Sequence, residues 1–198
     1  MFTGIVRGVG AIVAVQERGG DVRLQVDVGA LSPASLQLGA SIAVNGVCLT
    51  VAEREPGVTS FDVSRETMAR TTLGAAIVGS RVNIEPALTL QDPLGGHLVS
   101  GHVDGLGVVV DLQPDARSVR VRLRLPQELL RYVAAKGSIC VDGVSLTVND
   151  VVGDCAGVNV VPHTLGHTIM SDYRAGTAVN IEVDLVARYL ERLTAGRS

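Results

Sequence analysis

Four side chains of this sequence carry groups that could transfer protons or attack a substrate. His97 and His102 lie five positions apart, and an imidazole titrates near neutral pH, which suits a general acid or base. Cys48 and Ser145 each follow a predicted turn, and a thiol or hydroxyl beside a base can act as a nucleophile. The histidines could equally be structural or half of a metal site, but no third cysteine or histidine and no acidic cluster stands near them.

The chain repeats itself at a fixed spacing of 97 residues. Of the first 85 residues, 24 are identical to the residue 97 positions later, and the clearest pair of segments is 41–51 with 138–148. We infer a tandem duplication of one small domain, because the period exceeds the roughly 20 to 50 residues of solenoid repeats. Two copies of one unit predict two similar ligand sites.

The two copies differ at the reactive positions. Cys48 aligns with Ser145, His102 aligns with Ile5, and no residue of the first copy aligns with His97. Strand alternation sends the apolar neighbours of Cys48 and Ser145 to one face, so these two side chains should point outward. An outward thiol or hydroxyl is often an ordinary surface group, but its change between otherwise matching strands indicates two sites with unequal chemistry.

Short strands must position these residues. Valines, glycines and short apolar runs indicate a mainly β protein, and Asn45-Gly46 and Asp142-Gly143 predict type I′ hairpin turns. About six strands in each half, with few helices to cover open edges, favour a closed barrel. The predicted fold class is therefore all-β, with two tandem closed barrels. One short helix is expected in each half, over 31–38 and 126–135.

Glycine and proline cluster directly after a strand in Asp92–Gly96, which predicts the linker between the halves. We expect a first barrel over residues 1–96, a second barrel over 97–184 and a C-terminal α-helix over 185–198. Apolar side chains at helical spacing in this last segment predict packing on its own barrel or, as we favour, association with other copies. The helix is accordingly the expected oligomerisation element.

The composition argues against several classes of protein. A net charge of −3 without a basic stripe argues against a nucleic-acid partner. No apolar run reaches the roughly 18 residues of a membrane span and no secretion signal opens the chain, so we expect a cytoplasmic protein without a membrane partner. Three cysteines without close spacing predict free thiols, with neither disulfides nor a zinc site.

Polar groups recur at matching places in the two halves. Residues 62–67 hold polar side chains in one predicted loop, and residues 161–164 hold them in its counterpart. Asn83 and Asn180 lie inside otherwise apolar strands, where a buried amide needs a hydrogen-bond partner. That partner could be a ligand or the backbone.

Five motifs occur in order along the chain: Met1–Val6, Asn45–Val51, Gly95–Val103, Asp142–Val148 and Val179–Asp184. Together they resemble the riboflavin synthases of the alpha-chain type. The resemblance covers essentially the whole chain, and the joint occurrence of these motifs in this order is highly specific. The fold and chemistry of that family are therefore expected here.

The resemblance implies a transferase of riboflavin biosynthesis. Such enzymes convert two molecules of 6,7-dimethyl-8-ribityllumazine into riboflavin and 5-amino-6-(ribitylamino)uracil by moving a four-carbon unit between them. Each six-stranded Greek-key barrel would bind one lumazine, with no metal and no bound cofactor. The chain would form a homotrimer through its C-terminal helices, with each site between the first barrel of one subunit and the second barrel of its neighbour. The family also suggests association with lumazine synthase.

The motifs carry over the family's site residues as well. The catalytic candidates are Cys48, His102, Ser145 and Thr147, supported by His97 and Asp142. The first-barrel pocket would consist of Gly4, Ile5, Val6, Cys48, Leu49, Thr50, Asp62, Val63, Ser64, Arg65, Glu66 and Thr67. The second would consist of Gly101, His102, Val103, Ser145, Leu146, Thr147, Val161, Pro162, His163, Thr164, Leu165 and Gly166. Lys136 would reach the ligand from the adjoining subunit.

Two non-enzymatic alternatives compete with this prediction. A lumazine- or flavin-binding relative would hold the ligand without converting it, and it would lose the positions that Cys48, His97 and His102 occupy here. A flavin-binding regulatory or storage module would need no difference between the two copies. The retained residues and the asymmetry of the copies favour the enzyme.

Overall fold

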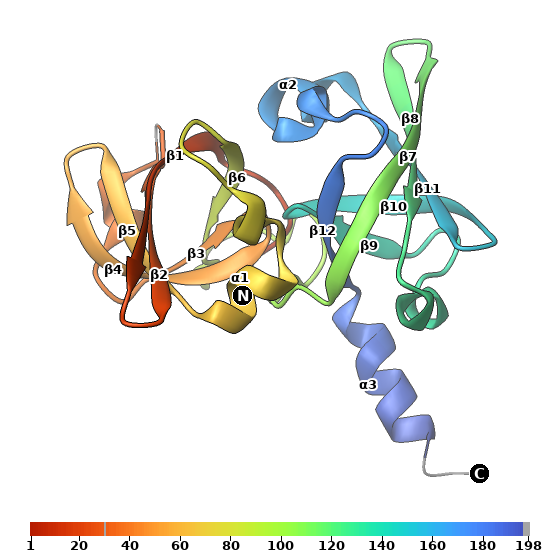
Figure 1. Cartoon of the computed structure of the whole chain (residues 1–198). Coiled ribbons are helices and arrows are strands. Elements are labelled where there is room, and N and C mark those ends of the chain that lie inside the picture. The colour runs from red at the N-terminus through yellow and green to blue at the C-terminus, as the bar shows by residue number, and fades with distance from the viewer. Residues whose placement is uncertain (30, 196–198) are drawn as a thin grey trace.

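Two closed β-barrels lie side by side, and a C-terminal helix projects away from them (Figure 1). The computed structural model describes residues 1–29 and 31–195. The strand order around the first barrel is β1-β2-β5-β4-β3-β6, and around the second it is β7-β8-β11-β10-β9-β12. The first barrel consists of β1 (Gly8–Arg18), β2 (Asp21–Asp27), β3 (Ser41–Val44), β4 (Val47–Glu55), β5 (Val58–Val63) and β6 (Arg81–Pro86). The second consists of β7 (Gly105–Asp115), β8 (Ser118–Arg124), β9 (Ser138–Val141), β10 (Val144–Val152), β11 (Cys155–Val160) and β12 (Ala178–Val183).

The duplication seen in the sequence is repeated in the strands. Every strand of the second barrel begins 97 residues after its counterpart, as Gly8 of β1 and Gly105 of β7 do. The β3–β4 and β9–β10 turns have φ of 47° at Asn45 and 45° at Asp142, each followed by a glycine with positive φ. Two successive left-handed residues define a type I′ turn. The predicted hairpins and the all-β fold of two six-stranded barrels are confirmed.

Each barrel is filled by its own apolar core. Leu49 on β4 and Leu146 on β10 are buried together with the valines on either side of them. Thr50 and Thr147 on the same strands are exposed, and Cys48 and Ser145 on the same outer side are partly exposed. The predicted alternation is therefore correct, and the candidate reactive groups Cys48 and Ser145 lie on the outer side of their strands.

The short helices differ from the prediction. The two expected helices are 3-10 turns, η1 (Pro33–Leu36) and η3 (Gln127–Tyr132). The predicted loops after β5 and β11 instead form α1 (Arg65–Arg70) and α2 (Pro162–His167). Each is followed by a further 3-10 turn, η2 (Thr72–Ala75) or η4 (Ile169–Asp172). The loop prediction was wrong because it overlooked two helix-start signals, the cap formed by Ser64 and the proline that opens α2.

The C-terminal helix α3 (Leu185–Thr194) forms where it was predicted, while residues 196–198 of the predicted segment lie outside the described residues. Asp184 caps it by accepting a hydrogen bond from the Val186 N–H at 3.0 Å. Its apolar side chains remain more than half exposed: Val186, Tyr189, Leu190 and Leu193. Nowhere in residues 1–29 and 31–195 does a helix have the length and apolar character that crossing a membrane requires.

Reciprocal hydrogen bonds join the two barrels. The Asn83 Nδ2 donates to the Asp142 carbonyl, and the Asn180 Nδ2 donates to the Asn45 carbonyl, both at 2.8 Å. The Oδ1 of each asparagine accepts a backbone N–H of the opposite half, again at 2.8 Å. The two strand-interior amides are therefore satisfied by the backbone of the other barrel, which decides between the two partners considered for them.

Candidate active site

The opening segment of each repeat lies against the other barrel. The Gly4 carbonyl accepts a hydrogen bond from the Ser145 N–H of β10 at 2.7 Å. The Gly101 carbonyl accepts one from the Cys48 N–H of β4 at 2.8 Å. Each reactive strand of one barrel is thus bound by the segment that precedes the first strand of the other.

Apolar contacts also place each opening segment against the opposite barrel. Val6 packs against the core of the second barrel, and Val103 packs against the core of the first. Gly4 and Val6, assigned to the first-barrel pocket, therefore contact the second barrel, and Gly101 and Val103, assigned to the second pocket, contact the first. The repeat shows which residues correspond, but it carries no information on which barrel each segment contacts.

His97 and Ser145 form a hydrogen-bonded pair on the second barrel. The His97 Nδ1 lies 2.7 Å from the Ser145 Oγ. The backbone N–H of His97 donates to the Thr3 carbonyl at 3.1 Å, next to the Gly4 carbonyl that holds Ser145. A histidine that contacts a serine hydroxyl can accept its proton, which is how a hydroxyl becomes a nucleophile.

Burial adjusts the chemistry of this histidine. His97 is only 8% exposed, and burial lowers its pKa from 6.5, with a smaller opposing effect of the Asp184 carboxylate. A lowered pKa keeps the imidazole neutral at neutral pH, which is the form that accepts a proton. Its Nε2 is buried and has no hydrogen-bond partner among the described residues. A ligand placed there could satisfy this nitrogen.

The first barrel presents a different pair of groups. Cys48 faces outward from β4, and His102 directly follows Gly101, whose carbonyl binds the Cys48 N–H. The side chain of His102 is exposed. The two histidines therefore do not form one cluster, because His97 belongs with Ser145 and His102 lies at the Cys48 side.

The remaining first-barrel candidates surround the end of β5. Asp62 binds Arg23 through bonds of 2.8 and 2.9 Å, and this hydrogen bonding lowers the pKa of Asp62. Ser64 accepts the Thr67 N–H at 3.2 Å, and Arg65 contacts the backbone beyond β1. These polar side chains lie at the surface, where a ligand or a neighbouring molecule can reach them.

The helices after β5 and β11 differ in surface chemistry. In α1, Glu66 forms an ion pair with Arg70 at 3.1 Å. The matching positions of α2 are His163 and His167, whose rings stack with centroids 4.1 Å apart. Three predicted binding residues have side chains buried in the cores and can offer a ligand only their backbone: Leu49, Val63 and Leu146. The exposed or partly exposed candidates around α2 are Val161, Pro162, Thr164, Leu165 and Gly166.

Asp142 lies between the barrels and is not brought into the His97–Ser145 pair. Its Oδ1 accepts the Asn180 N–H at 2.7 Å, and its Oδ2 accepts the Tyr173 hydroxyl at 2.6 Å. Burial raises its pKa from 3.8 to about 7. Because both of its carboxylate oxygens accept hydrogen bonds from the second barrel, Asp142 supports the turn that precedes Ser145.

Lys136 occupies a backbone conformation that favours glycine. Its φ is 67°, and the equivalent residue of the first copy is Gly39 with φ of 82°. Its N–H donates to the Val148 carbonyl at 2.7 Å, and its side chain is exposed. A lysine in this conformation has a backbone cost that a glycine avoids, which is why its side chain stays a candidate for ligand binding.

Two buried glutamates that bind the segments next to Ser145 and Cys48 were not predicted. Glu85 binds the backbone of Thr3 and Gly4, and Glu182 binds the backbone at the equivalent place in the second repeat. The sequence held a signal for them. Val-Asn-Ile-Glu occurs at the same place in both copies, and a carboxylate inside an apolar strand needs donors.

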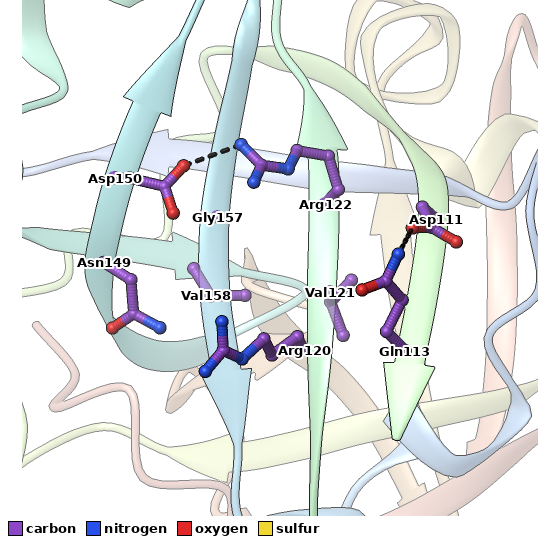
Figure 2. Close-up of a pocket in the computed structure, with 9 residues that line it drawn as sticks. All are labelled: Asp111, Gln113, Arg120, Val121, Arg122, Asn149, Asp150, Gly157 and Val158. Atoms are coloured by element: carbon purple, nitrogen blue, oxygen red, sulfur yellow. Dashed lines mark hydrogen bonds and ion pairs between the residues drawn. The ribbon is translucent and has the colours of Figure 1, made fainter. Parts of the chain in front are cut away.

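A polar hollow of about 340 Å³ on the outside of the second barrel lies apart from these residues (Figure 2). Arg122 on β8 binds Asp150 on β10 at 2.6 Å, and Gln113 binds Asp111 on the same strand at 2.8 Å, so the charges of the hollow are largely paired. Its lining consists of Asp111, Gln113, Arg120, Val121, Arg122, Asn149, Asp150, Gly157 and Val158. In the described part of the chain, no three side chains of His, Cys, Asp or Glu come together as a metal site.

Comparison with known proteins agrees with this geometry. The family model of the lumazine binding domain matches residues 3–87 and 100–184. The riboflavin synthase of Photobacterium phosphoreum is 43% identical over 193 residues, which cover 98% of this chain and 88% of that protein. The riboflavin synthase of Mycobacterium bovis (strain ATCC BAA-935 / AF2122/97) is 44% identical over 197 residues, covering 98% of both. The crystal structure of LumP complexed with riboflavin has a TM-score of 0.84 and 26% identity, and the match covers 92% of this chain and 99% of that one.

The matched domains coincide with the two barrels, and the identities extend over nearly the whole chain. The resemblance inferred from the five sequence motifs is thereby confirmed. This chain belongs to the riboflavin synthase family and is built from two lumazine-binding domains.

Proposed function

We propose that this chain is a riboflavin synthase, a transferase that converts two molecules of 6,7-dimethyl-8-ribityllumazine into riboflavin and 5-amino-6-(ribitylamino)uracil. One molecule donates a four-carbon unit and the other accepts it. The relatives named riboflavin synthase, at 43% and 44% identity over nearly the whole chain, support this activity.

The observation that carries the proposal is the unequal chemistry of two matching pockets. The second barrel holds His97 and Ser145 in contact at 2.7 Å, whereas the first presents Cys48, whose N–H binds the carbonyl of Gly101, the residue before His102. A dismutation gives two identical molecules different fates. Two similar pockets with different reactive groups meet that requirement, and two identical pockets would not.

The His97–Ser145 pair has the properties that the first steps need. A methyl proton on the lumazine ring must be removed, and a nucleophile or an activated water can add to the ring. A neutral His97 can take the methyl proton directly, or it can take the Ser145 proton as that oxygen adds to the ring. Both routes need an uncharged imidazole, which its burial favours.

We propose that the chain acts as a homotrimer held by α3. Apolar side chains of α3 are exposed in the single chain, and the helix points away from the barrels (Figure 1). Thr50 and Thr147 are also exposed on the outer side of β4 and β10, so a neighbouring subunit can reach both candidate sites. In this arrangement the first barrel of one subunit faces the second barrel of the next, and Lys136 extends to the neighbour's ligand.

Three further expectations stay predictions. They are the boundaries at residues 96 and 184, a cytoplasmic location, and association with lumazine synthase. None of them is needed for the chemistry proposed for the two pockets.

The main alternative is a protein that binds lumazine or a flavin without converting it. Cys48, His97 and His102 are all present, and the contact between His97 and Ser145 supplies a base next to a hydroxyl, which conversion needs and binding alone does not. These features favour the enzyme.

Turnover decides between the two. Purified protein would be incubated with dimethylribityllumazine, and riboflavin formation followed by absorbance. We expect one riboflavin and one pyrimidine product for every two lumazines consumed. The His97→Gln variant is the control, since it should keep the fold and bind lumazine but convert it far more slowly. Tight binding of lumazine by the wild-type protein without product would refute the enzymatic proposal.

A further inference from the structure

Two buried glutamates connect each barrel to the pocket of the other. Glu85 on β6 and Glu182 on β12 correspond at the 97-residue spacing, and each is only 4% exposed. We propose that they are positioning residues that act across the barrels. Glu85 of the first barrel sets the geometry of the His97–Ser145 pocket, and Glu182 of the second sets that of the Cys48 pocket. That these two places bind lumazine rests on the proposed function, whereas the link from each glutamate to the reactive residues of the other barrel rests on contacts alone.

Glu85 binds three donors on two successive residues. Its Oε1 accepts from the N–H and the hydroxyl of Thr3, both at 2.7 Å, and its Oε2 accepts from the Gly4 N–H at 3.0 Å. The carbonyls of these two residues bind the His97 N–H at 3.1 Å and the Ser145 N–H at 2.7 Å. One carboxylate therefore fixes the segment that holds both members of the reactive pair.

Glu182 repeats this arrangement for the first barrel. Its Oε1 accepts from the N–H and the hydroxyl of Ser100 at 2.6 and 2.7 Å, and its Oε2 accepts from the Gly101 N–H at 2.9 Å. The Gly101 carbonyl binds the Cys48 N–H at 2.8 Å. The Ser100 hydroxyl also accepts the His102 N–H at 3.2 Å. Glu182 thus fixes the segment that binds the backbone of both Cys48 and His102.

The held segments lie in direct contact with the reactive side chains. A Cβ at Gly4 would come within 2.6 Å of the Ser145 Cβ, and a Cβ at Gly101 would come within 2.6 Å of the Cys48 Cβ. Both glycines also have positive φ, 73° and 80°. A shift of either segment would move the reactive group with it, and a misplacement of about 1 Å can cost on the order of a hundredfold in rate.

A purely structural role explains these residues less well. Burial raises the pKa of both carboxyls, so holding them inside the protein is costly, and apolar side chains would fill the space without that cost. Charge-assisted bonds to two successive residues fix the direction of the intervening peptide. The glutamates are identical in the two copies, whereas their targets, Cys48 and Ser145, differ. The same arrangement of a glutamate and two backbone N–H groups therefore positions two different reactive groups.

Each glutamate is the matched control for the other. In Glu85→Gln, an NH2 group replaces the Oε2 that accepts the Gly4 N–H and cannot accept it, so the hydrogen bond from the Ser145 N–H to the Gly4 carbonyl should weaken. Backbone amide exchange, measured by NMR, should become at least about tenfold faster at Ser145, with little change at Cys48. Glu182→Gln should do the reverse, and it should also change the alkylation rate of the Cys48 thiol. Both variants should lower kcat more than they raise KM.

The crossed pattern is the result that supports the proposal. Faster exchange only within the mutated barrel, equal effects of each variant on both pockets, or no effect on either would overturn it. If the glutamine variants fail to fold, Thr3→Val and Ser100→Ala each remove one hydrogen bond to the same carboxylates, and the same crossed pattern is expected with smaller amplitude. Amide exchange and alkylation need no turnover. If the variants show the crossed pattern but the wild-type protein forms no riboflavin, the proposed function is refuted and the positioning role remains.

Discussion

Replacing Asp142 with asparagine should stabilise the protein above about pH 7 and have little effect below pH 4. Asp142 is only 2% exposed, and burial raises its pKa from 3.8 to about 7. Because the folded-state pKa lies above the unfolded value, the stability linked to this group is fully present below pH 3.8 and is lost as the pH rises through about 7. Asparagine carries no charge to bury and avoids that loss.

The size of the effect follows from the pKa. The rise from 3.8 to about 7 spans about three pH units, each about 1.4 kcal/mol, so the loss is about 4 kcal/mol. In a chain of 198 residues, 1 kcal/mol shifts Tm by about 2 to 4 °C, which predicts a Tm on the order of 10 °C higher for the variant at pH 8. Asn45 shows that an amide fits, since its Oδ1 accepts the Asn83 N–H at 2.7 Å as the Asp142 Oδ1 accepts that of Asn180.

Thermal unfolding followed by circular dichroism between pH 4 and 8 tests this prediction. The difference in Tm between variant and wild type at each pH removes the contribution of all other titrating groups. Asn45→Asp is the reverse control and should introduce a similar loss at high pH, because Ala76 stands where the second copy has Tyr173 and offers no hydroxyl donor. A Tm difference that does not change with pH would show that Asp142 stays charged throughout, and the reasoning would be refuted.

Three further outcomes are expected from the same geometry. Ser145→Ala should lower turnover by about a hundredfold or more in steady-state kinetics, while Ser138→Ala, at the far end of the neighbouring strand, should change turnover little. Equal small effects of the two substitutions would show that Ser145 is an ordinary surface residue. The kcat/KM should fall as the pH drops through the lowered pKa of His97, so its acidic limb should have a midpoint below 6.5, and a midpoint above that value would contradict a buried neutral base. Ending the chain at Asp184 should leave both barrels folded by circular dichroism, disperse the proposed trimer in light scattering and reduce turnover. A truncated chain that is still trimeric would show that α3 is not the contact between subunits.

Much of the fold could be predicted because its signals are local. The Asn45-Gly46 and Asp142-Gly143 turns fix two hairpins, and strand alternation fixes which residues face the cores. The helices α1 and α2 were missed because a helix of six residues has too few turns to show periodicity, so only Ser64 and Pro162 announce them. Short helices of this kind depend on their caps and on packing.

The candidate site could be predicted only in part, for a different physical reason. Residue types and the repeat point to Cys48, Ser145 and the two histidines, but the contacts between them are long-range. The bond from Ser145 to Gly4 joins residues of different repeats, and no local preference encodes it. The burial of Asp142 could not be predicted for the same reason, since its partners Tyr173, Asn180 and Asn83 come from distant parts of the chain.

The opening segment of each repeat contacts the opposite barrel, and this explains how one short stretch of chain makes two similar pockets unequal. Residues 97–102 begin at the Ser145 side, where His97 contacts that serine, and end at the Cys48 side, where His102 follows Gly101. Each pocket thus gains one histidine from the same stretch, and the first repeat contributes only Ile5 at the place matching His102. Changes in a few residues between the barrels could therefore differentiate both pockets at once without altering either core. A dismutation needs that separation, because the scaffold must bind two identical molecules while the reactive groups treat them differently.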